Sequence, residues 1–161
     1  MPVNLLPTRA ASRRNPMKGA PLEVLRRVPL FGDLDADELR EIAALFRERD
    51  FAPGTTILQE GSEGSGFYVI EAGQAQVLIQ GRPESALQAG DFFGEVALID
   101  DGPRMATVTA ATRLDTWALT PADFRTLVVA RGVIAWKLLQ RLARMLREER
   151  RHRAAGQVRQ G

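Results

Sequence analysis

The sequence contains no cysteine and a single histidine, His152, which lies close to its C-terminal end. Without cysteine the chain has no disulfides and no thiol nucleophile, and one histidine cannot supply the clustered ligands of a typical metal enzyme. No serine has a plausible histidine partner within the domain, so we expect no enzymatic activity. The sequence also lacks an apolar run near the ~20 residues of a membrane span, and it lacks the apolar core of a secretory signal. We therefore expect a cytoplasmic protein.

The charge of the chain is unevenly distributed. The 161 residues are 45% apolar and 26% charged, which is typical of one ordinary globular domain with tails. The net charge of +2 comes from +5 over residues 1–27, −9 over residues 28–131 and +6 over residues 132–161. An acidic body therefore lies between two basic ends, and a cation within that body stands out as a candidate ligand for an anion.

The composition predicts three regions. Residues 1–20 mix prolines with Arg, Ser and Asn without any sustained period, so we expect a disordered basic arm. A domain follows over residues 21–151, with a barrel at about 50–120 and helices over 121–151. Residues 152–161 form a short basic tail.

Two short helices are expected before the barrel. Leu22, Leu25 and Val28 indicate the first, which Pro29 ends. Asp35 and Glu38 have the spacing of a helix-capping box and mark the start of the second, whose apolar face would comprise Leu39, Ile42, Ala43 and Phe46.

After Pro53-Gly54 the pattern becomes that of short strands separated by glycine-rich turns. Strands are expected at 55–58, 66–71, 74–80, 84–88, 105–110 and 115–119, and the stretch that begins at Asp91 lies between the fourth and the fifth of them. Turns that need positive φ are expected at Gly61, Gly64, Gly66, Gly73, Gly81 and Gly90. This spacing predicts an α+β fold that is mainly β, an antiparallel jelly-roll barrel flanked by N-terminal helices and a long C-terminal helix.

Two helices are expected after the barrel. Thr120 and Pro121 are typical of a helix start, and this helix would run to about Ala130, where Gly132 breaks it. A longer helix is expected from Val133 to about Arg151. It carries apolar residues on more than one face and a basic stripe formed by Lys137, Arg141, Arg144 and Arg147.

The stretch from Asp91 to Ala110 contains the strongest candidate for a binding site. Gly94 allows a close approach of the backbone to a ligand, and the N–H groups of the helical turn after it would face an anion. Arg104 offers a planar fork that matches phosphate oxygens two at a time. Glu95 makes sense beside an anion if it accepts hydrogen bonds from a sugar hydroxyl. On these residues alone, an arginine in solvent or in an ion pair with Asp100 or Asp101 is an equally good interpretation of Arg104.

This stretch resembles the phosphate-binding cassette of the cyclic nucleotide-binding domain family, which includes catabolite activators and protein kinase A regulatory subunits. The resemblance rests on Gly94-Glu95, Ala97, Leu98, Arg104, Ala106 and Val108, and on an upstream motif formed by Gly61, Gly64, Phe67 to Ile70 and Gly73. It implies that Glu95 binds the ribose 2′-hydroxyl and that Arg104 pairs with the cyclic phosphate. The ligand site implied by this resemblance consists of Phe93, Gly94, Glu95, Val96, Ala97, Arg104, Met105 and Ala106.

The resemblance also implies how the domain works. Met105 stands where most of the family has Ser, Thr or Ala, and it has no hydroxyl for a guanine edge, so cAMP is favoured over cGMP. The long C-terminal helix would close over the base as a lid, through Leu138, Arg141, Leu142 or Met145. We expect a stand-alone sensor without a cofactor, which relays occupancy to an unidentified effector protein and is able to form a homodimer through this helix.

Two other interpretations remain open at this point. The domain could keep the fold without its ligand and serve as a protein interaction module, which Met105 favours and the Glu95-Arg104 pair opposes. Arg147, Arg150, Arg151 and Arg153 could hold nucleic-acid phosphates weakly, although a solvated helix end is the better interpretation of them.

Overall fold

The computed structural model describes residues 19–63, 66–100 and 102–158. The predicted arm over residues 1–20 lies almost wholly outside the described residues, and so does Gly64. Ala20, which we assigned to the arm, is buried, and its N–H donates to the carbonyl of Ala43 at 2.9 Å. The ordered domain therefore begins slightly earlier than residue 21.

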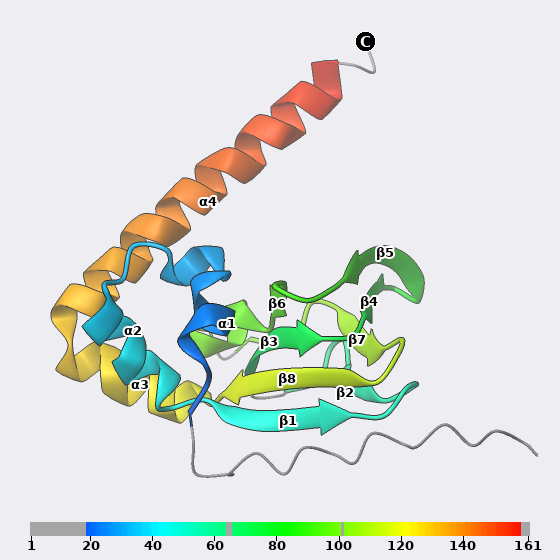
Figure 1. Ribbon diagram of the computed structural model, residues 1–161. Helices are drawn as coiled ribbons and strands as arrows, with labels where there is room; N and C mark the ends of the chain where they lie inside the picture. Colours follow the sequence, from blue (N-terminus) through cyan, green and yellow to red (C-terminus); the bar gives the residue numbers. More distant parts are fainter. Residues whose placement is uncertain (1–18, 64–65, 101, 159–161) are drawn as a thin grey trace, which may run out of the picture.

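The barrel is made of two antiparallel four-stranded sheets (Figure 1). In order across the sheet, the first contains β1 (Arg47–Phe51), β8 (Leu114–Leu119), β3 (Phe67–Ala72) and β6 (Phe92–Phe93). The second contains β2 (Thr56–Leu58), β7 (Thr107–Ala110), β4 (Ala75–Ile79) and β5 (Arg82–Leu87). Together with the flanking helices, this arrangement confirms the predicted α+β jelly-roll architecture.

The sequence pattern missed strand β1. Its sequence, Arg-Glu-Arg-Asp-Phe, is almost entirely charged and shows no apolar alternation. The structure explains the charge, because β1 lies at the edge of its sheet and pairs only with β8 among the described strands. Charged residues are common on edge strands, where they oppose pairing with other chains.

The N-terminal segment forms α1 (Leu22–Arg26), the 3-10 helix η1 (Pro29–Phe31) and α2 (Ala36–Ala43). The predicted capping box is present, since the Glu38 N–H donates to Asp35 Oδ1 at 2.9 Å and the Asp35 N–H donates to Glu38 Oε1 at 3.0 Å. The N–H of Glu38 stabilises the carboxylate and holds the pKa of Asp35 below its ordinary value. Helix α2 ends at Ala43, so Phe46 lies beyond it and not on its face as predicted.

Three buried phenylalanines join these helices to the barrel. Phe31 of η1, Phe46 and Phe67 of β3 are at most 1% exposed. Their rings meet edge to edge or edge to face, with centroids 6.0–6.2 Å apart. Such pairs contribute beyond their buried area, so the N-terminal helices share one core with the first sheet.

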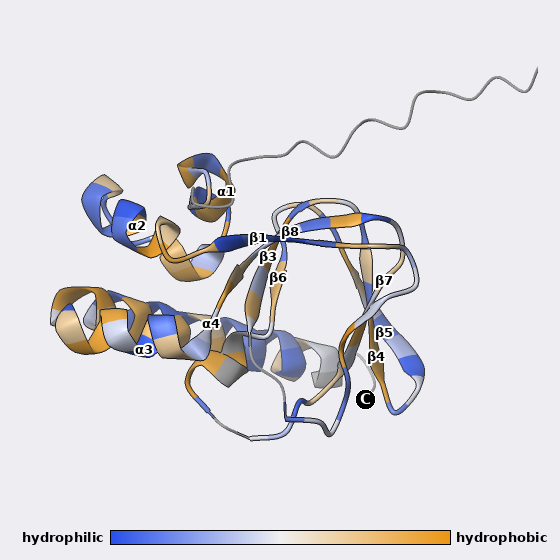
Figure 2. Cartoon of the chain, turned by 90° about the horizontal axis from the view of Figure 1, so that it is seen from below, coloured by the Kyte–Doolittle hydropathy of each residue, from blue (hydrophilic) through white to orange (hydrophobic). Residues whose placement is uncertain are grey.

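Two helices follow the barrel, α3 (Pro121–Ala130) and α4 (Gly132–Val158). Thr120 caps α3 as predicted, but the residue that interrupts the helix is Arg131, with φ −125° and ψ 78°, and Gly132 already begins α4. Helix α4 continues to Val158 instead of ending near Arg151, and it projects well beyond the barrel (Figure 1). Good helix formers and an i,i+4 pair between Glu149 and Arg153 at 2.8 Å support this extension. Both hydrophobic and hydrophilic residues are distributed along α4 (Figure 2).

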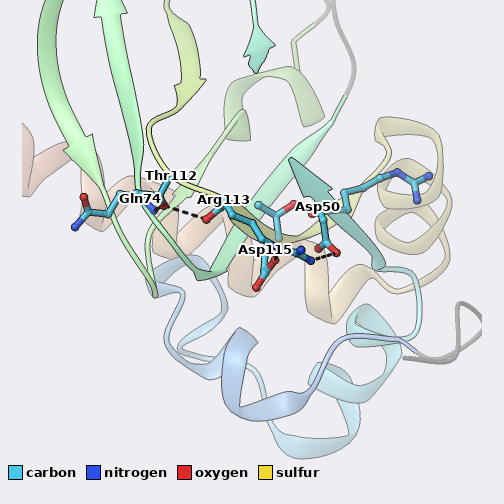
Figure 3. A network of polar contacts seen from close by, with 7 residues as sticks. Asp50, Gln74, Thr112, Arg113 and Asp115 are labelled. Carbon is cyan, nitrogen blue, oxygen red and sulfur yellow. Dashed lines mark hydrogen bonds and ion pairs between the residues drawn. The ribbon is translucent and has the colours of Figure 1, made fainter. Parts of the chain in front are cut away.

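A polar cluster connects strand ends and turns of the barrel (Figure 3). Arg113, in the turn before β8, pairs with Asp115 at 3.1 Å and with Asp50 of β1 at 3.3 Å. The hydrogen bond and charge of Asp115 raise the pKa of the Arg113 guanidinium above its ordinary value. The Gln74 N–H donates to Thr112 Oγ1 at 3.0 Å, which ties this turn to the turn before β4. The cluster fixes strand ends and lies outside the lining of the pocket described below.

Among the helices of the described part of the chain, none is both long and apolar enough to cross a membrane.

Two valines provide a test of whether the N-terminal helices belong to the folding unit. Val28 is fully buried between α1 and η1, whereas Val129 on α3 is 80% exposed. We expect Val28→Ala to lower the free energy of unfolding by about 2 kcal/mol, because it removes buried methyl groups. The same change at Val129 is expected to stay within about 0.5 kcal/mol of the parent chain. Equal urea midpoints for the two variants would show that the first helices are not part of the cooperative core.

Candidate functional site

The site is organised around a contact between two glycines. Strand β6 pairs with β3 through Phe93 and Tyr68, and Gly94 follows β6 with φ +84°. A Cβ atom at Gly94 would lie only 2.3 Å from the carbonyl oxygen of Gly66, which immediately precedes β3. No side chain fits in this position, and the left-handed φ also favours glycine. The contact fixes where the next turn begins.

That next turn is the 3-10 helix η2 (Glu95–Leu98), which carries the predicted residues Glu95, Val96 and Ala97. The first N–H groups of a helical turn have no partner within the turn and carry its positive end. Because Gly94 directly precedes η2, the first N–H groups of η2 lie next to the contact between Gly94 and Gly66. The arrangement suits an anion at this corner of the barrel.

Arg104 lies against the same corner. Its side chain is 7% exposed, and Nη2 donates to the carbonyl of Gly66 at 3.3 Å. A Cβ on Gly94 would lie 3.3 Å from Arg104 Nη1, so the guanidinium also packs directly on Gly94. The Arg104 backbone is fixed as well, since its N–H donates to Ser62 at 3.0 Å and its carbonyl accepts from Gly61 at 2.8 Å. The interpretation of Arg104 as a solvated surface arginine is therefore wrong.

A pocket of about 300 Å³ opens beside these residues. Among its described lining residues Arg104 is the only charged one. The lining also includes the predicted residues Phe93, Gly94, Val96, Met105 and Ala106. A cation surrounded by apolar side chains interacts strongly with an opposite charge, because little water screens it. The pocket can therefore hold a small ligand that combines an anionic group with an apolar or aromatic part.

The sequence did not identify the far wall of this pocket. Leu58 of β2, Val77 of β4 and Leu87 of β5 come from the second sheet and line it together with Val108 of β7. They are ordinary inward-facing strand residues, so no local signal distinguishes them from other core positions. At the rim, Met105 is 77% and Val96 52% exposed, which leaves both available to a ligand.

The structure does not bring the predicted lid residues to the pocket. Leu138 and Leu142 line a separate apolar cavity of about 220 Å³ with Leu98 and other residues of η1, α3 and α4. The guanidinium of Arg141 lies beside the turn after η1, where a Cβ on Gly32 would be 4.0 Å from its Cζ. None of the described residues that line the first pocket belongs to α4. Helix α4 therefore lies away from the pocket in this structure.

The sequence of this chain matches a family model and is similar to sequences of known proteins. A family model described as "Cyclic nucleotide-binding domain" matches residues 48–131. A cAMP-dependent protein kinase regulatory subunit of Yarrowia lipolytica is 40% identical over 106 residues, which are 65% of this chain and 28% of that protein. The chain thus spans little more than a quarter of that relative's length.

Solved structures of other proteins have a similar fold. The N-terminal domain of a transcriptional regulator from Streptomyces coelicolor A3(2) has a TM-score of 0.71 and 35% identity, covering 78% of this chain and 94% of that one. The regulatory domain of Toxoplasma gondii PKA, crystallised with cAMP, has a TM-score of 0.61 and 32% identity, covering 66% and 42% of the two chains.

The glycine contact predicts different costs for two similar substitutions. Gly94 and Gly81 both have positive φ, but a Cβ at Gly81 would meet no atom within 4 Å. Gly81→Ala should therefore cost about 1 kcal/mol, from backbone strain alone. Gly94→Ala should cost about 2–4 kcal/mol, because the collision with Gly66 is added to that strain. Urea denaturation of both variants measures the difference, and equal costs would disprove the close contact.

Proposed function

Because this chain belongs to the cyclic nucleotide-binding domain family, as its match over residues 48–131 shows, we propose that it binds cAMP in the pocket beside Arg104. The observation that carries the proposal is the burial of Arg104, 7% exposed, directly against Gly94 at the start of η2. A cyclic phosphate there meets the guanidinium fork on one side and the N–H groups of η2 on the other. The cAMP in the Toxoplasma gondii structure supports this choice of ligand.

The position of Glu95 supports recognition of the sugar. It is the first residue of η2, next to Gly94, so it lies one residue from the point where the phosphate is proposed to bind. A carboxylate accepts hydrogen bonds and cannot donate them, which suits the 2′-hydroxyl of ribose and disfavours direct contact with the phosphate. Glu95 and Arg104 would then bind different atoms of one nucleotide.

The apolar wall of the pocket favours adenine over guanine. Among the described lining residues, Arg104 is the only one whose side chain can donate a strong hydrogen bond, and Met105 at the rim offers only a thioether. Guanine has more polar groups on its edge than adenine, and a polar group buried without a partner costs free energy. We therefore expect cAMP to bind more tightly than cGMP.

We further propose that the domain acts as a sensor, without a reaction of its own, whose output is a movement of α4. Leu98 of η2 lines the same cavity as Leu138 and Leu142 of α4, and Leu98 and Leu138 belong to one hydrophobic cluster, so the nucleotide-binding turn shares an apolar core with that helix. A lid function requires α4 to swing so that Leu138, Arg141, Leu142 or Met145 reaches the base. A ligand shifts such an equilibrium only by its difference in affinity for the two positions of the helix.

The proposed output surface is formed by exposed apolar residues of α4. Trp136, Leu139 and Leu146 are 57–63% exposed on this helix, which leaves apolar surface for an effector protein or for a second copy of this chain.

Calorimetric titration with cAMP and cGMP tests the proposed ligand. We expect Arg104→Ala to weaken cAMP binding by about 30-fold or more, because it removes one partner of a buried, hydrogen-bonded charge pair. Arg104→Lys should also lose affinity, since lysine keeps the charge without the two-pronged geometry. Arg82→Ala, an exposed arginine of β5 outside the pocket, is the matched control and should bind normally. A folded parent chain that binds neither nucleotide would favour the interaction-module alternative.

A pair of leucines on α4 tests the lid. Leu142 is partly buried near η2, whereas Leu146, one turn further on, is 59% exposed. If Leu142 contacts the base in the closed position, Leu142→Ala should weaken cAMP binding by about threefold to tenfold through lost apolar contact. Leu146→Ala should leave the affinity unchanged. Unaltered affinity in a folded Leu142→Ala protein would exclude this residue from the lid.

A further inference from the structure

Acidic residues of α2 and of the turn before it pair with basic residues of α4 and of the junction before it. Three ion pairs cross between them, Glu41 with Arg131, Glu38 with Lys137 and Asp33 with Arg144. The Glu38 pair is the most buried, with its Nζ and Oε1 atoms 2.5 Å apart and the Glu38 side chain 5% exposed. We call these six residues the ionic seam. It accounts for much of the basic stripe of α4, whose partners the sequence did not reveal.

The ionic seam extends from the joint between α3 and α4 outward along α4. Arg131 is the non-helical residue between the two helices, and Gly132 after it has no neighbour within 4 Å of a Cβ position. Lys137 and Arg144 follow at intervals of six and seven residues, so the three cations span about 20 Å of helix. The first pair holds the joint, and the last pair holds α4 at the greatest distance from it.

The ionic seam is weak enough to open. The cations at its two ends, Arg131 and Arg144, are 45% and 48% exposed, so water and salt compete for both pairs. In its middle, Glu38 Oε2 is buried and has no hydrogen-bond partner among the described residues. A buried polar atom without a partner costs free energy, so it reduces the free-energy difference between the closed ionic seam and an opened one.

We propose that the ionic seam is a latch that holds α4 against the N-terminal helices and away from the nucleotide pocket. This inference rests on the proposed lid function, because closure of α4 over the pocket then requires the ion pairs of the ionic seam to break. In a population-shift description, the apparent affinity for the nucleotide equals the intrinsic affinity multiplied by the fraction of molecules that are unlatched. The ionic seam would therefore set how much nucleotide is needed to move α4.

The latch is tested without any nucleotide. Because the chain has no cysteine, spin labels can be placed by Glu84→Cys on β5 and Ala154→Cys on α4, both at exposed positions outside the pocket. The distance distribution between the labels reports the position of α4. We expect the double variant Asp33→Asn/Glu41→Gln to raise the ratio of unlatched to latched molecules by about threefold to tenfold, and 0.5 M salt to act in the same direction.

The control removes two carboxylates elsewhere. Asp37→Asn/Asp50→Asn breaks the pairs with Arg40 and Arg113, neither of which reaches α4, and should leave the distribution as in the parent. The charge exchange Asp33→Arg/Arg144→Asp should restore the outer pair and the latched distribution. An unchanged distribution in the Asp33/Glu41 variant, or the same change in the control, would overturn the latch.

A titration with cAMP then separates the latch from the proposed function. If both hold, the Asp33→Asn/Glu41→Gln variant binds cAMP more tightly than the parent by the factor that the labels report. A shifted label distribution with unchanged cAMP affinity would support the latch and reject the lid.

Discussion

The close contact between Gly94 and Gly66 is the constraint on which the site depends. It brings the end of β6 within van der Waals distance of the residue before β3, and Arg104 then packs over the junction and donates to the Gly66 carbonyl. With a side chain at Gly94, the turn η2 would start elsewhere and the guanidinium would lose the surface that it covers. The backbone geometry of two glycines thus decides where the positive charge of the pocket lies.

The burial of Arg104 places a positive charge where little water reaches it. Arg104 is nearly buried in a pocket whose other described lining residues are uncharged, and a guanidinium in such surroundings loses most of its hydration. The same loss of hydration strengthens its attraction to an anion that enters the pocket. A buried cation of this kind is typical of functional sites in otherwise apolar surroundings.

Helix α4 makes both apolar contacts and ion pairs with the rest of the molecule. Its apolar residues pack on η1 and α3, and two cations of its basic stripe pair with Glu38 of α2 and with Asp33 in the turn before α2. Trp136 and Leu146 are exposed to solvent. The first contact is non-directional, whereas the ion pairs fix one position of the helix. Movement of α4 can therefore keep part of the apolar contact while the ion pairs break.

The sequence by itself determined the fold class, the capping box at Asp35, the start of α3 and the stretch that holds Gly94 and Arg104, because periodicity, caps and turn glycines are local signals. It missed β1, whose charges suit a sheet edge that only the paired strands define. Tertiary structure alone decided the burial of Arg104, the apolar wall from the second sheet, the acids opposite the basic stripe and the position of the lid candidates away from the pocket. Each of these depends on which elements meet in space, and local sequence patterns do not show which residues far apart in the chain become neighbours.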